Sequence, residues 1–162
     1  MTKPAPPIEL TGTAARLTHR AVNVEPRVLD VLSAICPTAV DVETRADASR
    51  DWWPLAMHWA LGGMAPQVAA AVCSPRSTAD VSAVIAECAE HGIPVTAAGG
   101  RSGVNGASVP VFGGVVLDLT ALQGIASVDA NSGVVEVWAG TFGPDLEREL
   151  NEWHGLSVGH FP

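Results

Sequence analysis

The chain of 162 residues carries little positive charge. Nine Lys and Arg residues face 17 Asp and Glu residues, which gives a formal net charge of −8. This balance argues against a broad surface for nucleic acid or anionic membranes, although an anion site built from backbone amides would not show in it. No lysine follows Lys3, so the sequence excludes a phosphate-binding loop that ends in Gly-Lys-Ser/Thr.

Cysteine, histidine clusters and long apolar runs are also scarce. Cys36, Cys73 and Cys88 lack metal-ligand spacing, so we expect reduced core residues. The five histidines form no His-x-x-His or Cys/His group, which argues against a metal site. Glycine, proline and glutamine interrupt the most apolar stretch, residues 59–75, so we expect no membrane span. The N-terminus lacks the basic start and apolar run of a signal peptide, and we expect a cytoplasmic protein.

Apolar residues make up 48% of the chain, enough for a buried core. Residues 1–12 have the composition of a loose, Pro-rich leader. Apolar spacing predicts a helix from residue 26 to about 35, and residues 41–51 are typical of a partly helical segment. Three tryptophans follow within residues 52–59. Indoles that cover a core edge are the favoured interpretation, and a lid over a substrate or cofactor is the alternative.

The middle of the chain predicts a β-α-β unit. A short strand ends at Pro75, Ser77 and Asp80 form a helix N-cap, and Gly92 ends that helix before the strand at residues 94–98. The two strands are therefore expected to be parallel, with a right-handed crossover. Further strands are predicted at 114–119 and on both sides of a turn near residue 131. A second helix is predicted from residue 143, and a last strand from residue 155.

A glycine-rich loop joins two of these predicted strands. The stretch AAGGRSGVNGAS, residues 97–108, holds four glycines, and Pro110 and a strand follow it instead of a helix. A dinucleotide fingerprint of the doubly wound type needs a helix at that point, so it fits poorly. Glycines permit positive φ, and successive amides in such turns form concave anion sites. Arg101 adds charge, and hydrogen bonds are available from Ser102, Asn105 and Ser108. A simple chain reversal is the alternative, but the loop is long for that.

The order of these motifs resembles the FAD-binding domain of the vanillyl-alcohol-oxidase superfamily, also called the p-cresol methylhydroxylase (PCMH) type. The motifs are Pro and Ser/Thr before a helix in CSPRSTADV, the glycine loop after the next strand, and Ala-Gly at the end of VEVWAG. The resemblance covers residues 69–162 and leaves residues 1–68 as a mostly helical or irregular extension. The ending GHFP after the helix LERELNE is most similar to alkyldihydroxyacetonephosphate-synthase-type proteins.

The resemblance implies an α+β, PCMH-type fold with a small mixed sheet, a β-α-β unit and flanking helices. It implies FAD as the cofactor, with the diphosphate in the glycine loop and the adenine and ribose near Pro75 and the Ala-Gly pair. His160 lies where family chains turn towards the flavin ring, although a surface histidine is the more common case. The family commonly has glycine at the position of Arg101. The implied cofactor residues are Pro75, Ala97, Ala98, Gly99, Gly100, Arg101, Ser102, Gly103, Val104, Asn105, Gly106, Ala107, Ser108, Ala139, Gly140 and His160.

Family members continue past GHFP with a second FAD-contacting loop and a substrate domain that carries the catalytic residues. We therefore expect a truncated, N-terminal portion of a flavin-dependent oxidoreductase or an alkyldihydroxyacetonephosphate-synthase-like enzyme. It would be catalytically incomplete, with no catalytic residue of its own, and a small-molecule substrate would bind only in a full-length form. Two alternatives remain: a non-catalytic nucleotide- or phosphate-binding domain, and a non-functional truncated product.

Overall fold

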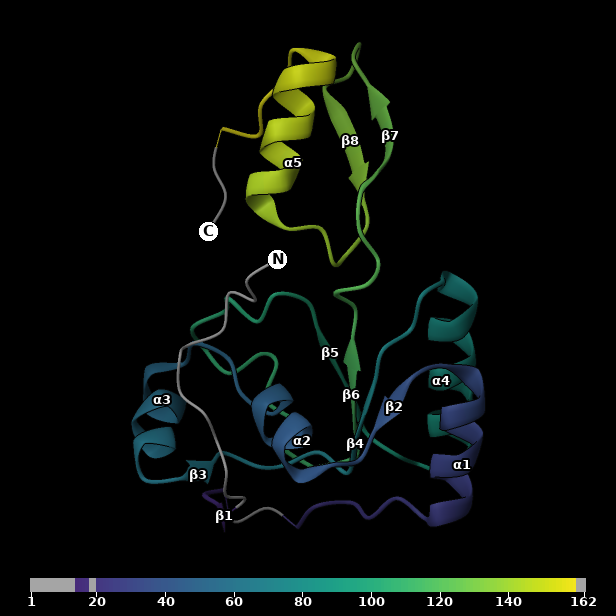
Figure 1. Cartoon of the computed structure of the whole chain (residues 1–162), viewed down its shortest axis with the longest axis vertical. Helices are drawn as coiled ribbons and strands as arrows, with labels where there is room; N and C mark the ends of the chain where they lie inside the picture. The colour runs from purple at the N-terminus through teal and green to yellow at the C-terminus, as the bar shows by residue number, and fades with distance from the viewer. Residues whose placement is uncertain (1–13, 18–19, 160–162) are drawn as a thin grey trace.

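A four-stranded mixed sheet forms the centre of the protein in a computed structural model, which describes residues 14–17 and 20–159 (Figure 1). The strand order is β2-β4-β6-β5. β4, β6 and β5 are parallel, and β2 runs antiparallel to β4. The strands are β2 (Thr38–Ala39), β4 (Ala71–Cys73), β5 (Val95–Ala98) and β6 (Val115–Asp118). The predicted α+β fold with a small mixed sheet is therefore confirmed.

Helix α4 (Thr78–Glu90) connects β4 to β5 and completes the predicted β-α-β unit. The Ser77 hydroxyl accepts a hydrogen bond from the Asp80 amide (3.1 Å) and donates one to the Asp80 carboxylate (2.8 Å). Gly92, with φ of +62°, follows the helix end, as predicted. The two strands of the unit are parallel but not adjacent, because β6 lies between them.

Helices cover both faces of this sheet (Figure 1). On one face, α1 (Pro26–Ile35) and α4 pack on alternate strand residues such as Ala71 and Leu117. On the other face, α2 (Val42–Ala48) packs through Ala48 on Val72 and Val116. Burial on both faces explains why β6 is apolar from Val115 to Leu117, since such strands need no polar alternation. The three cysteines are buried and free, which confirms reduced core residues.

The region before residue 69 shares this core. Leu32 of α1 is fully buried in the same cluster as β4 and β6. α3 (Pro54–Leu61) follows the tryptophan pair, and β1 (Ala14–Ala15) pairs in parallel with β3 (Met64–Ala65). The predicted leader, residues 1–12, lies outside the described residues. Within the described part of the chain, no helix is both long enough and apolar enough to cross a membrane.

A hairpin and a helix form a separate unit beyond the sheet (Figure 1). β7 (Ile125–Asp129) and β8 (Val134–Val137) are antiparallel, and α5 (Gly143–Glu149) continues as a π-helix, η1 (Leu150–His154). The predicted hairpin and second helix are confirmed.

The strand predicted from residue 155 is wrong. Gly155 ends η1 with φ of +63°, and residues 156–159 are irregular. This segment turns back along α5, because the Glu147 carboxylate accepts hydrogen bonds from the Ser157 hydroxyl and the Val158 amide (3.1 Å). The alternating apolar residues of segment 155–158 therefore do not form a strand.

Candidate cofactor site

Three loops meet at one edge of the sheet because β4, β5 and β6 are parallel. Pro75 follows the carboxyl end of β4, the glycine loop follows β5, and the turn at residues 119–123 follows β6. In open sheets with parallel strands, ligands bind outside these carboxyl ends. The topology thus brings two of the sequence-predicted segments, Pro75 and the glycine loop, to the same edge.

The third predicted segment, Ala139 and Gly140, joins the other two. The Gly140 amide donates a hydrogen bond to the Leu122 carbonyl (2.8 Å), and a Cβ on Gly140 would overlap the Leu119 carbonyl oxygen. A Cβ on Gly99 would lie 3.1 Å from the Ala139 carbonyl oxygen. A side chain at Gly140 is therefore excluded, and one at Gly99 would make a tight contact, so the glycine loop begins directly beside the Ala-Gly pair.

The glycine loop leaves its backbone amides unused. Between Gly99 and Ser108, no amide donates a hydrogen bond to another residue in the described part of the chain. Most of these residues are exposed. Among the four loop glycines, Gly106 alone has a left-handed φ (+84°). The positive φ that glycine permits is therefore adopted at one of the four positions. A run of free amides is the property that an anion site built from backbone requires.

Arg101 stands where the family commonly has glycine, and the structure shows how the chain accommodates it. Its φ is +54°, the left-handed region that side chains rarely adopt. The residue is only 8% exposed, and its Nη2 lies 3.4 Å from Asp47 Oδ2. Asp47 also contacts Arg50, at 2.7 Å. The charge that the sequence suggested for a phosphate is therefore directed towards α2.

Arg101 and Asp47 line a polar cavity of about 220 Å³ on the α2 side of the sheet, together with Glu43, Thr44, Ala48, Val72 and Asp118. Asp118 accepts hydrogen bonds from the Thr120 amide (3.0 Å) and hydroxyl (2.6 Å). Asp118 is therefore a hydrogen-bonding residue at the end of β6.

The segment between α2 and α3 supports the glycine loop. The Trp52 amide donates a hydrogen bond to the Gly103 carbonyl (2.9 Å). The Trp53 ring lies against Gly106, where an added Cβ would be 3.3 Å from Trp53 Cε3. Trp53 also meets Trp59 edge to face, with 5.4 Å between ring centroids. Sequence reasoning missed these contacts, because nothing local links residues 52 and 53 to a loop so far along the chain.

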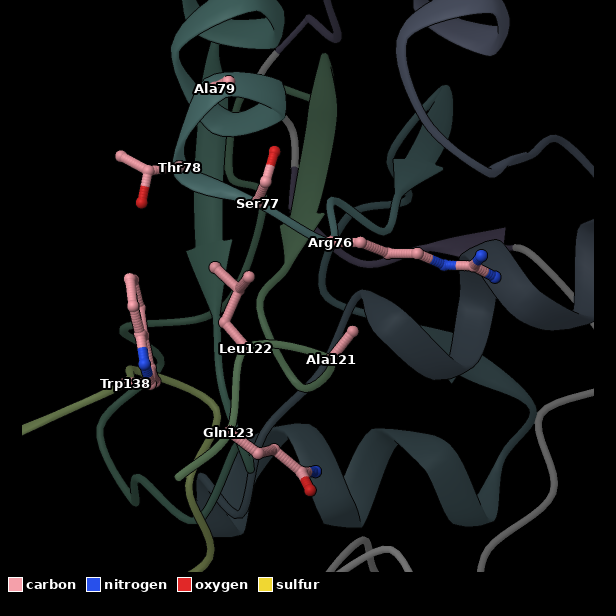
Figure 2. Close-up of a pocket in the computed structure, with 8 residues that line it drawn as sticks. All are labelled: Arg76, Ser77, Thr78, Ala79, Ala121, Leu122, Gln123 and Trp138. Atoms are coloured by element: carbon pink, nitrogen blue, oxygen red, sulfur yellow. The ribbon is translucent and has the colours of Figure 1, made fainter. Parts of the chain in front are cut away.

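A larger cavity lies between the start of α4 and the end of β8 (Figure 2). Its volume is about 490 Å³, within the range typical of small-molecule sites. The resemblance places Pro75 and Ala139 near the adenine. Pro75 directly precedes Arg76 and Ala139 directly follows Trp138, and both Arg76 and Trp138 line this cavity. The lining residues are Arg76, Ser77, Thr78, Ala79, Ala121, Leu122, Gln123 and Trp138.

The N-terminus of α4 lies at one wall of this cavity, and the carboxylate of Asp80 lies in its first turn. The Arg76 amide donates a hydrogen bond to the Asp80 carboxylate (2.8 Å), and this bond and the one from Ser77 lower the pKa of Asp80. The carboxylate therefore stays ionised and neutralises this helix end. The free amides of the loop and the cavity beside the neutralised helix end are features of an anion site and a small-molecule site in an α+β domain.

A sequence model of the FAD binding domain family matches residues 69–162, so the chain belongs to this family. A D-lactate dehydrogenase of Anaerostipes hadrus is 32% identical over 133 residues, which are 80% of this chain and 26% of that protein. A mitochondrial D-2-hydroxyglutarate dehydrogenase of Danio rerio is 32% identical over 78 residues, 48% of this chain and 15% of its own length. FAD is thus the cofactor of this domain, as expected.

Solved structures show the same fold. An alkyldihydroxyacetonephosphate synthase superposes with a TM-score of 0.76 at 21% identity, over 95% of this chain and 32% of that chain. A p-cresol methylhydroxylase with bound substrate gives 0.64 at 18% identity, over 82% of this chain and 26% of that one. The PCMH-type fold is therefore confirmed, and the chain spans a third or less of each relative. His160 lies outside the described residues.

Proposed function

We propose that this chain forms the diphosphate- and adenosine-binding part of an FAD-linked oxidoreductase. The free amides between Gly99 and Ser108 hold the diphosphate, and the cavity of about 490 Å³ receives the adenosine. The observation that carries the proposal is the loop itself, whose exposed amides have no acceptor in the described protein. A dianionic group that accepts several of them gains charge-assisted hydrogen bonds.

The division of the site between diphosphate and adenosine follows from charge. The Asp80 carboxylate lies at the start of α4, where it accepts hydrogen bonds from the Arg76 amide and the Ser77 hydroxyl, so a phosphate at that wall would meet a carboxylate. A neutral base and sugar meet no such repulsion. The glycine loop lies next to this cavity, since Gly99 approaches the carbonyl of Ala139. A nucleoside diphosphate can therefore extend from the cavity to the loop.

For the full-length protein, we propose oxidation of a D-2-hydroxy acid. The names of two sequence relatives, D-lactate dehydrogenase and D-2-hydroxyglutarate dehydrogenase, support this substrate class. FAD, when bound, supplies the two-electron acceptor for such an oxidation. The described residues bind and orient the cofactor, and we assign no catalytic residue among them. Alkyl transfer is the alternative, supported by the structural likeness to an alkyldihydroxyacetonephosphate synthase.

A titration of the full chain with FAD and ADP tests the cofactor site. In Gly100→Val, a branched side chain in the loop should keep the diphosphate from the amides, so we expect at least tenfold weaker binding of both ligands. The matched control is Gly62→Val, at a glycine outside the loop and the cavity with φ of −94°. Its Cβ would lie 3.4 Å from the Trp59 carbonyl oxygen, an ordinary contact, so the FAD affinity should stay within about twofold.

Thermal unfolding without ligand shows whether each variant is folded. Unchanged FAD affinity in folded Gly100→Val would remove the loop from the site. Binding of inorganic phosphate by the wild-type chain without binding of FAD or ADP would favour the simple phosphate-binding alternative.

A further inference from the structure

Trp138 is an exposed aromatic residue on a fixed backbone. Its amide donates a hydrogen bond to the Gly124 carbonyl (3.0 Å), and its carbonyl accepts one from the Thr141 hydroxyl (2.7 Å). The residue is nevertheless 42% exposed and lines the large cavity. An indole on a fixed backbone has only two side-chain torsions to order, so little conformational entropy is lost when a ligand covers it.

The rest of the cavity suits a flat, neutral ring. Trp138, Leu122 and Thr78 line the same cavity, and Figure 2 shows the Arg76 side chain extending away from them. Apolar carbons come from Leu122, Ala121 and Ala79, and a hydroxyl group comes from Thr78. A heteroaromatic base presents an apolar face and a polar edge, and this lining offers a partner for each.

Trp138 also lies next to the start of the glycine loop in the fold. Trp138 directly precedes Ala139, and the Ala139 carbonyl is the atom that Gly99 approaches at the start of the glycine loop. The stacking surface and the diphosphate loop are thus joined through a single residue.

We propose that Trp138 stacks on the adenine ring of the bound nucleotide and sets the preference of this site for an adenine-containing ligand. This inference rests on the function proposed above and adds the residue that recognises the base. Stacking of one base on an aromatic side chain contributes roughly 1–3 kcal/mol, which corresponds to about 5- to 150-fold in affinity.

The test compares ADP with inorganic pyrophosphate, which offers the same diphosphate without a base. Calorimetric titration of the full chain should show Trp138→Leu binding ADP about 5- to 150-fold more weakly, with pyrophosphate affinity within twofold of wild type. Trp138→Phe keeps an aromatic face and should recover most of the loss. Trp153→Leu is the control, since Trp153 is 73% exposed and does not line this cavity.

Each other outcome overturns the inference in a recognisable way. If Trp138→Leu binds ADP as tightly as wild type, the base does not stack there, while the proposed cofactor site stands. If ADP and pyrophosphate weaken equally, Trp138 only supports the fold of the loop. If the wild-type chain binds neither ADP nor FAD, the proposed function fails and the inference fails with it.

Discussion

The guanidinium of Arg101 lies 3.4 Å from the carboxylate of Asp47, and this contact joins the glycine loop to helix α2. Among the described residues, Arg101 is the one non-glycine residue with positive φ. A side chain in that backbone region costs about 1–2 kcal/mol. The ion pair and the burial of the arginine stem offset this cost. The backbone can therefore adopt the left-handed conformation at this position without the usual glycine.

Arg101→Gly and Asp47→Asn should therefore have different effects on stability. Glycine removes both the ion pair and the backbone strain, and Asp47 keeps its contact with Arg50, so we expect a change within about 1 kcal/mol. Asp47→Asn removes the carboxylate from both Arg101 and Arg50, whose side chains are buried, so we expect a loss of about 2 kcal/mol, below the value for fully buried pairs because Asp47 is a third exposed. Urea unfolding measures both variants, and a loss in Arg101→Gly as large as that in Asp47→Asn would contradict this expectation.

Two tryptophans offer a matched test of support for the glycine loop. Trp53→Leu and Trp59→Leu both remove the edge-to-face pair, but only Trp53 contacts Gly106. Each should lower the free energy of unfolding by about 2–4 kcal/mol. Trp53→Leu should also weaken FAD binding several-fold, because the loop loses the ring that fixes Gly106. FAD titration at a temperature where both variants are folded provides the measurement, and equal affinity in the two variants would contradict this role.

The stability of the protein should fall in acid through its capping carboxylates. Hydrogen bonds from the Arg76 amide and the Ser77 hydroxyl lower the pKa of Asp80 from its ordinary value of 3.8. A backbone hydrogen bond from Thr44 does the same for Asp41. A carboxyl group whose pKa is lower in the folded state stabilises the fold above pH 3.8 and loses this effect as the pH falls further.

We therefore expect the melting temperature to decrease below about pH 4, and Asp80→Asn to decrease less steeply with pH in that range. Thermal melts between pH 6 and pH 2.5 check this expectation. A variant that follows the wild-type slope would show that Asp80 keeps its ordinary pKa in the folded protein.

The three cysteine thiols should be unreactive in the folded protein. Burial raises the pKa of Cys36 and Cys88, and raises that of Cys73 to about 12. Because the thiolate is the reactive form, a disulfide reagent at pH 8 should label none of them until the chain unfolds. Absorbance of the released thiol should then report all three in guanidinium chloride. Rapid labelling of the native protein would contradict their burial.

The sequence by itself determined the elements that depend on near neighbours. Ser77 and Asp80 lie within one helical turn, so the start of α4 could be predicted from their spacing. The hairpin around residue 131 and the helix end at Gly92 follow from turn and glycine chemistry in the same way. The motif order also identified the FAD-binding family and the loop that carries the free amides.

The contacts between segments far apart in the chain depend on the tertiary fold. The place of β6 between β4 and β5, the bond from Trp52 to Gly103 and the pair of Asp47 with Arg101 join residues far apart in the chain. Periodicity and capping act over a few residues, so they carry no information about such contacts. These contacts form when the two faces of the sheet are buried, because close packing then leaves each loop few positions that avoid overlap.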